Sequence, residues 1–451
     1  MNDILITLSN RIELQVSGLP DKVADQIRAF LTLPNPKYEE AKKRGYSLYG
    51  IPKLLLFYRE IEDNRIICLR GFMGNLLSIL RENGLSYHLV DLRRILPELN
   101  LEFSGNLRAY QKKAVTETLK KDFGVIVAPC GSGKTVIACA IMATRKQPTL
   151  IICHTRELLN QWRDRIEQYL QIPRSEIGII GTGKEIIKPI TVGMVQTLCK
   201  RDLVEIRQHF GQIVVDECHH CPASSFIKVV ASFDCKYMLG LSATPYRRDG
   251  LNKLIYAILG NVSVEISDSE LQDSGCRIKP EIIVRETDFD FDYQEDSDYQ
   301  PMISELAEDH DRNELIVSDV IRESQENGNL SLILSDRKSH CEALAGLLRD
   351  QGIKCAVLTS DRSKKDRGAI IRDIESGALK VVCATGQLAG EGLDIPRLNR
   401  LFVITPIRFK GRITQYVGRA LRVDREKIDS KIYDYHDSKI GVRCRVYNSL
   451  N

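Results

Sequence analysis

The sequence predicts an α/β protein in which two tandem parallel-sheet domains follow a small N-terminal α+β domain. Short apolar runs alternate with helix-like segments from about residue 107 to residue 265, and the alternation starts again near residue 330. Strands that are buried on both faces produce such runs, and the segments between them are typical of crossover helices. Because residues 1–106 have a different pattern of apolar residues, we expect domains at 1–106, 107–265 and 266–451.

The N-terminal domain is predicted from a strand-like and a helix-like segment. NRIELQV (10–16) looks like a strand. DKVADQIRAFL (21–31) has the apolar spacing of an amphipathic helix, with Asp21 in the position of a cap. These two segments, one strand-like and one helix-like, indicate a small α+β domain.

The expected strands of the two larger domains are short and apolar. In the first they are GVIVAP (124–129), LIIC (150–153), QIVVD (212–216) and YMLGLS (237–242). In the second they are LSLILS (330–335), KCAVLTS (354–360), KVVCATG (380–386) and LFVITP (401–406). Between the two sets, the segment 285–298 holds seven acidic residues against one arginine, which is typical of a solvated loop and less often of an interaction segment.

Composition sets limits on the class of protein. The 451 residues suffice for roughly three domains of about 150 residues each. A net charge of +4 permits nucleic acid as a partner but does not argue for it. Thirteen cysteines without framework spacing indicate reduced thiols, and no apolar run is long enough to span a bilayer. The N-terminus MNDILITLSN does not resemble a signal peptide, so we expect a soluble cytoplasmic protein without a membrane partner.

The segment APCGSGKT (128–135) lies between the apolar run GVIV and the helical TVIACAIMA. Small residues there let backbone N–H groups close around phosphate oxygens. Lys134 then reaches the β- and γ-phosphates of ATP, and the Thr135 hydroxyl binds Mg²⁺. Ala128 stands where the phosphate-loop pattern has its first glycine, but GSGKT is intact. The order of strand, loop, Lys-Thr and helix favours an ATP site over an ordinary glycine turn.

A phosphate loop implies a second strand that ends in carboxylates, and VVDECHHCP (214–222) supplies it. Asp216 would hold Mg²⁺, and Glu217 would orient and polarise the attacking water. Cys218 and Cys221 have the spacing of a zinc knuckle. Because the chain has no second CxxC, no zinc is expected and both cysteines are interpreted as structural thiols.

Four segments in order resemble motifs I, II, III and VI of the superfamily 2 helicases. They are APCGSGKT (128–135), DECHH (216–220), SATP (242–245) and QYVGRALR (415–422). Three further segments resemble the Q motif, motif Ia and motif V: LRAYQ (107–111), HTRELLNQW (154–162) and ATGQLAGEGLDIP (384–396). The resemblance covers about residues 107–425 and implies two RecA-like domains that share one ATP with Mg²⁺.

The resemblance also assigns nucleotide contacts in the first domain. Arg108 and Gln111 of the Q motif are expected to bind the adenine. Gly131, Ser132 and Gly133 are expected to surround the phosphates beside the loop lysine.

The second domain is expected to complete the ATP site. The resemblance places Asp394 near the ribose and Gln415, Arg419 and Arg422 toward the γ-phosphate. Arg419 and Arg422 are three residues apart on a helix-like segment, so both can point to one face. An arginine finger contributes about 10³–10⁵ in rate, which makes hydrolysis sensitive to domain closure. Taken alone, the segment would more often be an amphipathic surface helix.

Nucleic-acid contacts are expected along one edge of both domains. The candidates are Thr155 and Arg156 in motif Ia, Gln196, and Thr385 in motif V. Hydroxyls and amides suit phosphate oxygens, which carry no sequence information. Relatives usually have Thr where Met194 stands, which removes one hydroxyl from this set.

Three residues are expected to couple the carboxylates to the DNA side: His219, Ser242 and Thr244. Ser242 and Thr244 could instead be ordinary strand-end caps. The single tryptophan, Trp162, could stack on a base, but a core position on a helix face is the commoner role.

Within the superfamily, DECH with QYVGRALR resembles the DNA translocases related to XPB and to the phage recombination helicase UvsW. The charged residues Arg247, Arg248 and Asp249 after motif III support this group. The resemblance implies an ATP-dependent helicase that unwinds or branch-migrates forked and four-way-junction DNA, as a monomer or weak oligomer. If the chain is phage-encoded, it would act in the bacterial host cytoplasm. The alternatives are the motor of a restriction-type complex, an RNA-remodelling helicase, and a nucleotide-gated scaffold.

The N-terminal segment 35–60 interleaves basic and aromatic residues: Lys42, Lys43, Arg44, Lys53, Tyr46, Tyr49 and Tyr58. Cations contact phosphates, and each stacked base contributes about 1–3 kcal/mol. A solvated helix followed by a packed strand is an equally good interpretation. Arg70-Gly71-Phe72 could let the backbone approach phosphate, or could simply form a turn. The hypothesis is that this domain docks duplex DNA or a branch point.

Overall fold

The computed structural model describes residues 4–43, 45–220, 224–243, 252–294, 298–326, 328–359, 361–386, 395, 397–406, 427 and 429–440. The chain divides into two compact units, residues 1–128 with 133–267 and residues 268–451 with 129–132. Each unit is described by itself below. The division into three domains stays a prediction, in which both 1–106 and 107–265 belong to the first unit.

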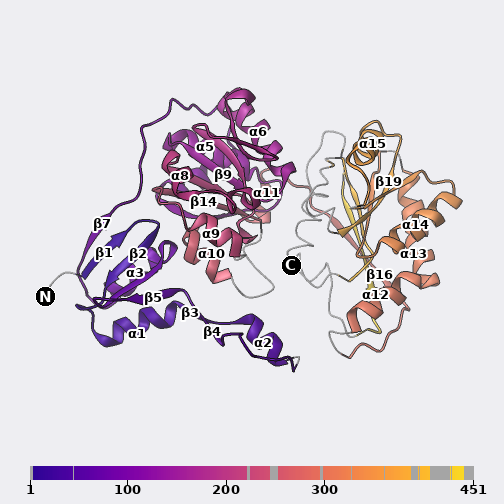
Figure 1. Cartoon of the computed structure of the whole chain (residues 1–451). Coiled ribbons are helices and arrows are strands. Elements are labelled where there is room, and N and C mark those ends of the chain that lie inside the picture. Colours follow the sequence, from indigo (N-terminus) through magenta and orange to yellow (C-terminus); the bar gives the residue numbers. More distant parts are fainter. Residues whose placement is uncertain are drawn as a thin grey trace. The chain divides into compact units, whose positions relative to one another are not determined.

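The N-terminal part of the first unit is a five-stranded sheet covered on one face by two helices (Figure 1). The strand order is β5-β6-β2-β1-β7, and β7 pairs in parallel with β1. The strands are β1 (Ile4–Leu8), β2 (Arg11–Gln15), β5 (Tyr58–Ile61), β6 (Arg65–Leu69) and β7 (Tyr87–Asp91). The helices are α1 (Asp21–Phe30) and α3 (Met73–Glu82), the latter after the 3-10 helix η1 (Arg70–Phe72).

The predicted helix at 21–31 forms as α1, but its cap is not the predicted one. Pro20 occupies the N-cap, and Asp21 is the first helical residue. A carboxylate in the first turn interacts favourably with the helix dipole, so Asp21 still suits its place. Val23, Ala24 and Ile27 form the buried stripe against the sheet.

A small arm extends from this sheet between α1 and β5 (Figure 1). It consists of β3 (Thr32–Pro34) paired with β4 (Leu54–Leu56) and the helix α2 (Pro36–Lys43). Asn35 closes its base, because its side-chain amide donates to the carbonyl of Pro52 at 2.7 Å. The same side chain accepts from the backbone N–H of Lys37 at 3.1 Å, which starts the helix.

The second part of the first unit is an eight-stranded sheet of order β11-β10-β12-β9-β13-β14-β8-β15. All neighbours are parallel except β10 and β11. The strands are β8 (Phe123–Val127), β9 (Thr149–Cys153), β10 (Gly178–Gly181), β11 (Lys184–Ile186), β12 (Ile190–Met194), β13 (Gln212–Val215), β14 (Tyr237–Ser242) and β15 (Val262–Glu265).

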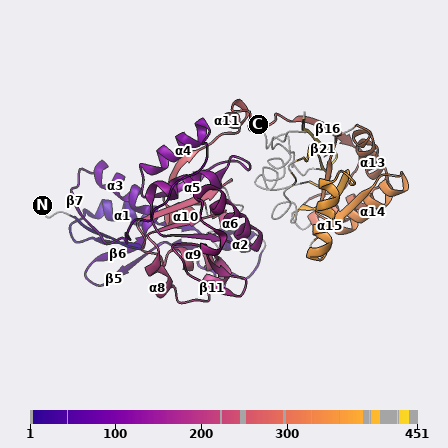
Figure 2. The ribbon, with the colours of Figure 1, turned by 90° about the horizontal axis from the view of Figure 1, so that it is seen from above.

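Helices cover both faces of this sheet (Figure 2). On one face lie α4 (Ala109–Leu119), α5 (Lys134–Arg145) and α6 (Arg156–Leu170). On the other lie α7 (Val195–Leu198), α8 (Leu203–Ile206), α9 (Ser224–Val230) and α10 (Asn252–Leu259). The short 3-10 helices are η2 (Arg174–Glu176), η3 (Arg207–His209) and η4 (Cys218–His220).

The N-terminal sheet is packed firmly against the second part of the first unit. Arg70 is 2% exposed, and its Nη1 donates to the carbonyl of Cys235 at 2.7 Å. At Gly71 a Cβ would lie 2.3 Å from the carbonyl oxygen of Tyr256 in α10, so only glycine fits. Arg93 adds an ion pair to Asp122 at 2.7 Å. The segment 70–72 is therefore a docking turn, and Arg70 is not free to approach phosphate.

The second unit is a six-stranded parallel sheet of order β16-β21-β20-β17-β19-β18. Its strands are β16 (Glu281–Thr287), β17 (Ser331–Ser335), β18 (Cys355–Leu358), β19 (Val381–Thr385), β20 (Arg400–Val403) and β21 (Lys431–Asp437). Its helices are α11 (Asp268–Asp273), α12 (Tyr299–Glu308), α13 (His310–Ser324), α14 (Lys338–Asp350) and α15 (Lys364–Glu375). The two parallel sheets confirm the predicted α/β class.

The acidic segment 285–298 begins in β16 and continues as a loop over the described residues 288–294. Phe289 in this loop is buried at 6% exposure. Phe289 packs with Met302, Ile303 and Leu306 of α12. The acidic side chains Asp288, Asp290 and Asp292 are exposed, and the apolar residues between them supply the buried contacts.

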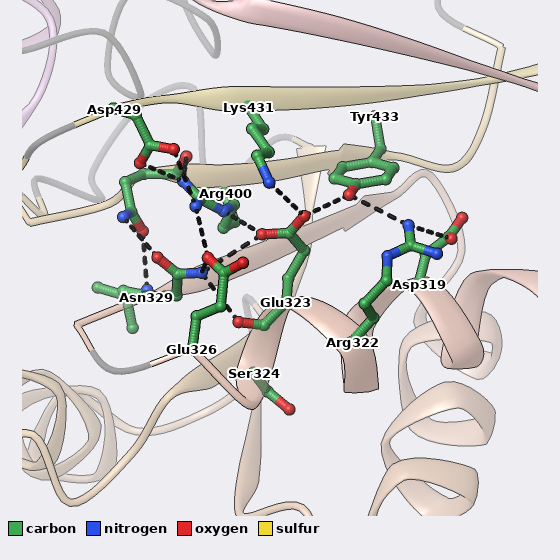
Figure 3. Close-up of polar contacts among 12 residues, drawn as sticks. Asp319, Arg322, Glu323, Ser324, Glu326, Asn329, Arg400, Asp429, Lys431 and Tyr433 are labelled. Atoms are coloured by element: carbon green, nitrogen blue, oxygen red, sulfur yellow. Dashed lines mark hydrogen bonds and ion pairs between the residues drawn. The ribbon is translucent and has the colours of Figure 1, made fainter.

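A buried polar cluster ties α13 to β20 and β21 in the second unit (Figure 3). Glu323 and Arg400 are an ion pair whose side chains are 3% and 1% exposed. The Tyr433 hydroxyl and the Lys431 ammonium also donate to Glu323. Burial by itself would raise the pKa of Glu323, but these donors outweigh it and the pKa lies below its ordinary value.

No helix in the described ranges is both long enough and apolar enough to cross a membrane. The described cysteines are all free thiols, and most are buried.

Candidate nucleotide and nucleic-acid site

The candidate residues of the first unit follow the carboxyl ends of neighbouring strands. The phosphate loop follows β8, Asp216 follows β13, and Ser242 ends β14. Thr155 follows β9, and Gln196 lies just after β12. Because these five strands are parallel neighbours, their candidate residues share one edge of the sheet. That edge is where open α/β sheets bind their ligands.

The phosphate loop has the backbone conformation that its glycines allow. Gly131 and Gly133 have φ angles of +87° and +80°, in the left-handed region. Lys134 begins α5 and lays its ammonium back over the loop, donating to the carbonyl of Ala128 at 3.1 Å. Thr135 is half-buried in the first turn of the same helix.

Gln111 of the predicted Q motif lies beside this loop. It is 5% exposed, and a Cβ at Gly133 would come within 2.5 Å of its Nε2. Its Oε1 accepts from the backbone N–H of Arg108 at 3.0 Å, at the start of α4. The Gln111 amide is thus fixed next to the loop, while Arg108 is exposed.

Both carboxylate oxygens of Asp216 are held by donors. Oδ2 accepts from the Trp162 indole Nε1 at 2.8 Å, and Oδ1 accepts from the backbone N–H of Glu217 at 3.0 Å. Burial raises the pKa of Asp216 to about 6, and the neighbouring Glu217 charge adds to the rise. Donation from Trp162 and the charge of Lys134 act in the opposite direction.

Asp216 and Thr135 suit a magnesium ion. A carboxylate and a hydroxyl are the hard oxygen donors that Mg²⁺ prefers. A buried carboxylate with a raised pKa is also a group whose ionised form a cation stabilises.

A polar chain connects the second carboxylate to the next strand. Nδ1 of His219 lies 3.2 Å from Glu217 Oε2 and 3.2 Å from Ser242 Oγ. The carbonyl of Ser242 accepts from the backbone N–H of Ala128 at 2.9 Å. The structure therefore brings together His219 and Ser242 in the way that a coupling role requires. Glu217 itself has φ +47°, an uncommon conformation for a residue with a side chain.

The candidate nucleic-acid residues lie at the β9 and β12 end of this edge. Thr155 is the N-cap of α6, and its side chain accepts from the backbone N–H of Leu158 at 3.2 Å. Arg156 and Gln196 are exposed, and Gln196 donates to the carbonyl of His154 at 2.8 Å. A hydroxyl that accepts this bond can still donate its own proton, for example to a phosphate oxygen.

The remaining candidates belong to the second unit or lie outside the described residues. Thr385 ends β19 in the second unit and is half-buried. Five others lie outside the described residues: Thr244, Asp394, Gln415, Arg419 and Arg422.

Of the two cysteines with zinc-knuckle spacing, the structure describes only Cys218. Cys218 is fully buried in the core beneath the sheet, while Cys221 lies outside the described ranges. Among the residues that the structure describes, no three His, Cys, Asp or Glu side chains gather as metal ligands.

Trp162 is the residue at this site that sequence reasoning missed. It is 1% exposed, which makes it a core residue, but its N–H also reaches Asp216. No sequence signal connects two residues 54 positions apart, because a tryptophan on a helix face indicates only burial.

Two family models match this chain. Residues 104–247 match the model described as Type III restriction enzyme, res subunit. Residues 312–424 match the model described as Helicase conserved C-terminal domain. The first match contains the phosphate loop and the carboxylates, and the second contains motifs V and VI.

Named relatives cover most of the chain. The DNA 3'-5' translocase XPB2 of Sulfurisphaera tokodaii is 27% identical in an alignment 390 residues long that covers 75% of this chain and 87% of the relative. The probable helicase D10 of Escherichia phage T5 is 27% identical over 378 residues, 79% of this chain and 77% of the relative.

Among solved structures, the helicase domain of Pyrococcus furiosus Hef is similar with a TM-score of 0.52. It is 15% identical and covers 75% of this chain and 96% of that domain. At this identity the likeness concerns the fold alone. The predicted two-domain RecA-like fold is confirmed.

Proposed function

This chain belongs to the superfamily 2 DNA helicases, in the group that includes XPB-like translocases and phage helicases, and on that premise we propose that it acts on branched DNA. The chain is an ATP-driven DNA helicase or translocase. The proposed substrates are forks and four-way junctions in recombination, replication or repair, with movement 3′ to 5′.

The proposed roles of the site residues follow from their chemistry. Lys134 and the loop N–H groups bind the phosphates, and Asp216 with Thr135 holds Mg²⁺. Mg²⁺, when bound, neutralises charge on the β- and γ-phosphates. Glu217 orients and polarises the attacking water. His219 contacts both Glu217 and Ser242, so a movement of the Glu217 side chain would also move Ser242.

In the same proposal the second unit completes the reaction. Arg419 and Arg422 stabilise charge on the γ-phosphate, while Gln415 and Asp394 contact the nucleotide. The Q-motif residues Arg108 and Gln111 hold the adenine. Thr155, Arg156, Gln196 and Thr385 bind DNA phosphates, and Thr244 assists the coupling.

The observation that carries the branched-DNA proposal is the arm of the N-terminal domain. Tyr49 is 96% exposed and Tyr46 is 63% exposed, although aromatic rings of this size are normally buried. Residues 36–53 contain five basic residues against two acidic ones, while the whole chain has a net charge of only +4. Exposed rings among cations suit unpaired bases and phosphates.

The sheet that carries the arm is docked against the ATP-binding sheet. Arg70 and Gly71, which follow β6 of the five-stranded N-terminal sheet, contact the part of the first unit that carries Lys134 and Asp216. A recognition element on a rigid mount positions a branch point reproducibly relative to the motor.

The proposed function is tested by steady-state ATPase with no nucleic acid, ssRNA, ssDNA, duplex, a fork and a four-way junction. We expect the fork and the junction to stimulate most, and Lys134→Ala to abolish hydrolysis. Maximal stimulation by ssRNA would instead indicate RNA remodelling. Equal stimulation by every DNA would remove the preference for branches.

Point variants of the arm test its role without exposing the docking surface. A triple variant should weaken junction affinity by at least about 5-fold, since one stacked base alone contributes about 1–3 kcal/mol. It combines Lys42→Ala, Lys43→Ala and Tyr49→Ala. Tyr87→Ala is the matched control, because Tyr87 is an exposed tyrosine of the same domain outside the arm. Hydrolysis without DNA should be unchanged in both. Equal junction affinity of the two variants would contradict the assignment.

A second candidate function is the motor of a restriction-type complex. The match of residues 104–247 to the Type III restriction enzyme model favours it. Such a motor would hydrolyse ATP in proportion to duplex length and without regard to branches. Comparing linear duplexes of increasing length with a short junction separates the two candidates.

A further inference from the structure

The only tryptophan of the chain is placed at the candidate magnesium carboxylate. Trp162 lies on α6, which carries a buried stripe of Leu159, Trp162, Ile166 and Leu170. Of these four, only Trp162 has a polar atom, and that atom donates to Asp216 Oδ2 at 2.8 Å.

The bond fixes the orientation of the Asp216 carboxylate. The backbone N–H of Glu217 already holds Oδ1 at 3.0 Å, so the indole is the second of two donors on opposite oxygens. An indole N–H donates only and does not titrate, so it stays in place at every protonation state of its partner. With both oxygens held, the lone pairs that remain have fixed directions.

The same helix begins at the candidate nucleic-acid residues. Thr155 caps α6, and Arg156 is its first helical residue. Trp162 follows Thr155 by seven residues, which is about two turns along one rigid element. A shift of the helix start therefore reaches the Asp216 carboxylate without any intervening loop.

We propose that Trp162 is a positioning residue that holds Asp216 in its magnesium-binding orientation and makes that orientation depend on helix α6. The proposal rests on the assignment of Asp216 as the magnesium carboxylate under the proposed function. Nucleic acid bound at the start of α6 would then act on the affinity for magnesium through this bond.

The first test is Trp162→Phe in the full chain, since phenylalanine keeps an aromatic ring in the core but lacks the N–H. Groups that orient metal ligands typically contribute about 10–100-fold, so the Mg²⁺ concentration for half-maximal ATPase should rise by that factor. The matched control is Ile166→Val, which trims the same buried stripe one turn later. The control should keep the wild-type Mg²⁺ dependence, and thermal midpoints verify that both variants fold.

Stimulation by DNA tests the link through the helix. At Mg²⁺ concentrations below saturation, we expect DNA to stimulate Trp162→Phe less than it stimulates wild type or Ile166→Val. An equal stimulation ratio would overturn the link, and an unchanged Mg²⁺ dependence would overturn the positioning role. If Ile166→Val shifted the Mg²⁺ dependence as much as Trp162→Phe, the role would be packing alone.

A second measurement uses the wild-type protein and does not depend on the variant's folding. Because Trp162 is the sole tryptophan, its fluorescence should change when Mg²⁺ and ADP are added together, but not with ADP alone. Asp216→Asn should abolish this response. An unchanged emission, while calorimetry records Mg²⁺-dependent ADP binding, would overturn the proposal. Failure of the proposed function looks different, because the wild type would then hydrolyse no ATP on any DNA.

Discussion

Replacing Arg400 with methionine should destabilise the second unit by about 3 kcal/mol. The magnitude follows from the exposure of its partners. Asp429 and Glu326 pair with Arg400 at 2.8 Å and 3.3 Å, but their side chains are 50% and 59% exposed, so each pair contributes about 1 kcal/mol or less. Glu323 is 3% exposed and would keep a buried charge (Figure 3).

The loss falls at the lower end of the usual range of about 3–5 kcal/mol for breaking a buried pair. The reason is that Lys431 at 3.0 Å and the Tyr433 hydroxyl still donate to Glu323 after the substitution. Glu323→Gln removes the buried charge, so Arg400→Met with Glu323→Gln should cost about 1–3 kcal/mol less than the sum of the single changes.

The sole tryptophan is in the first unit, so its fluorescence does not report on this region. Hydrogen exchange of the β20 and β21 amides, followed by mass spectrometry, measures the opening of the strands directly. A loss below about 1 kcal/mol for Arg400→Met, or strict additivity in the double variant, would refute the reasoning.

Three further predictions concern other parts of the chain. Burial lowers the pKa of His340 to about 3, so the unfolded state binds more protons between pH 3 and 6.5. Stability should therefore fall by about 2 kcal/mol from pH 6.5 to pH 5, and His340→Gln should flatten that slope in urea titrations. Gly71→Ala should lower stability by about 1–3 kcal/mol through overlap with Tyr256, whereas Gly74→Ala, with 3.8 Å of clearance inside α3, should raise it by about 0.5–1 kcal/mol. Equal urea midpoints for the two glycine variants would contradict the docking account. Arg156→Ala should weaken DNA binding and reduce the slope of log affinity against log salt by about 1, and an unchanged slope would exclude a phosphate contact.

The sequence predicted that the candidate residues of the first unit would follow apolar strands, and the structure shows that they do. The phosphate loop and the carboxylates are local patterns, and each follows its own apolar strand. Once the strands are parallel neighbours, Lys134, Asp216 and Ser242 must come to one edge of the sheet. His219 contacts Glu217 and Ser242, while the coupling role of these residues stays a prediction.

The features that sequence reasoning missed are pairings between distant residues. The segment Arg70-Gly71-Phe72 offered either a backbone approach to phosphate or a simple turn, and nothing in it indicated that Arg70 donates to a carbonyl 165 residues away. Arg400 and Glu323 lie 77 residues apart, and each resembles an ordinary surface charge in its own segment. Phe289 is a core residue, but the acidic residues on both sides of it gave no indication of burial. Periodicity detects which face is buried, but it does not identify the polar partner on the other side of the core.

The docking of the N-terminal sheet has a mechanical consequence. Arg70 holds the carbonyl of Cys235, and two residues later β14 begins. That strand runs six residues straight to Ser242, a span of about 20 Å. Under the proposed function, tension from DNA at the arm would thus reach Ser242 along one extended backbone, and from there the side-chain contacts of His219 lead to Glu217.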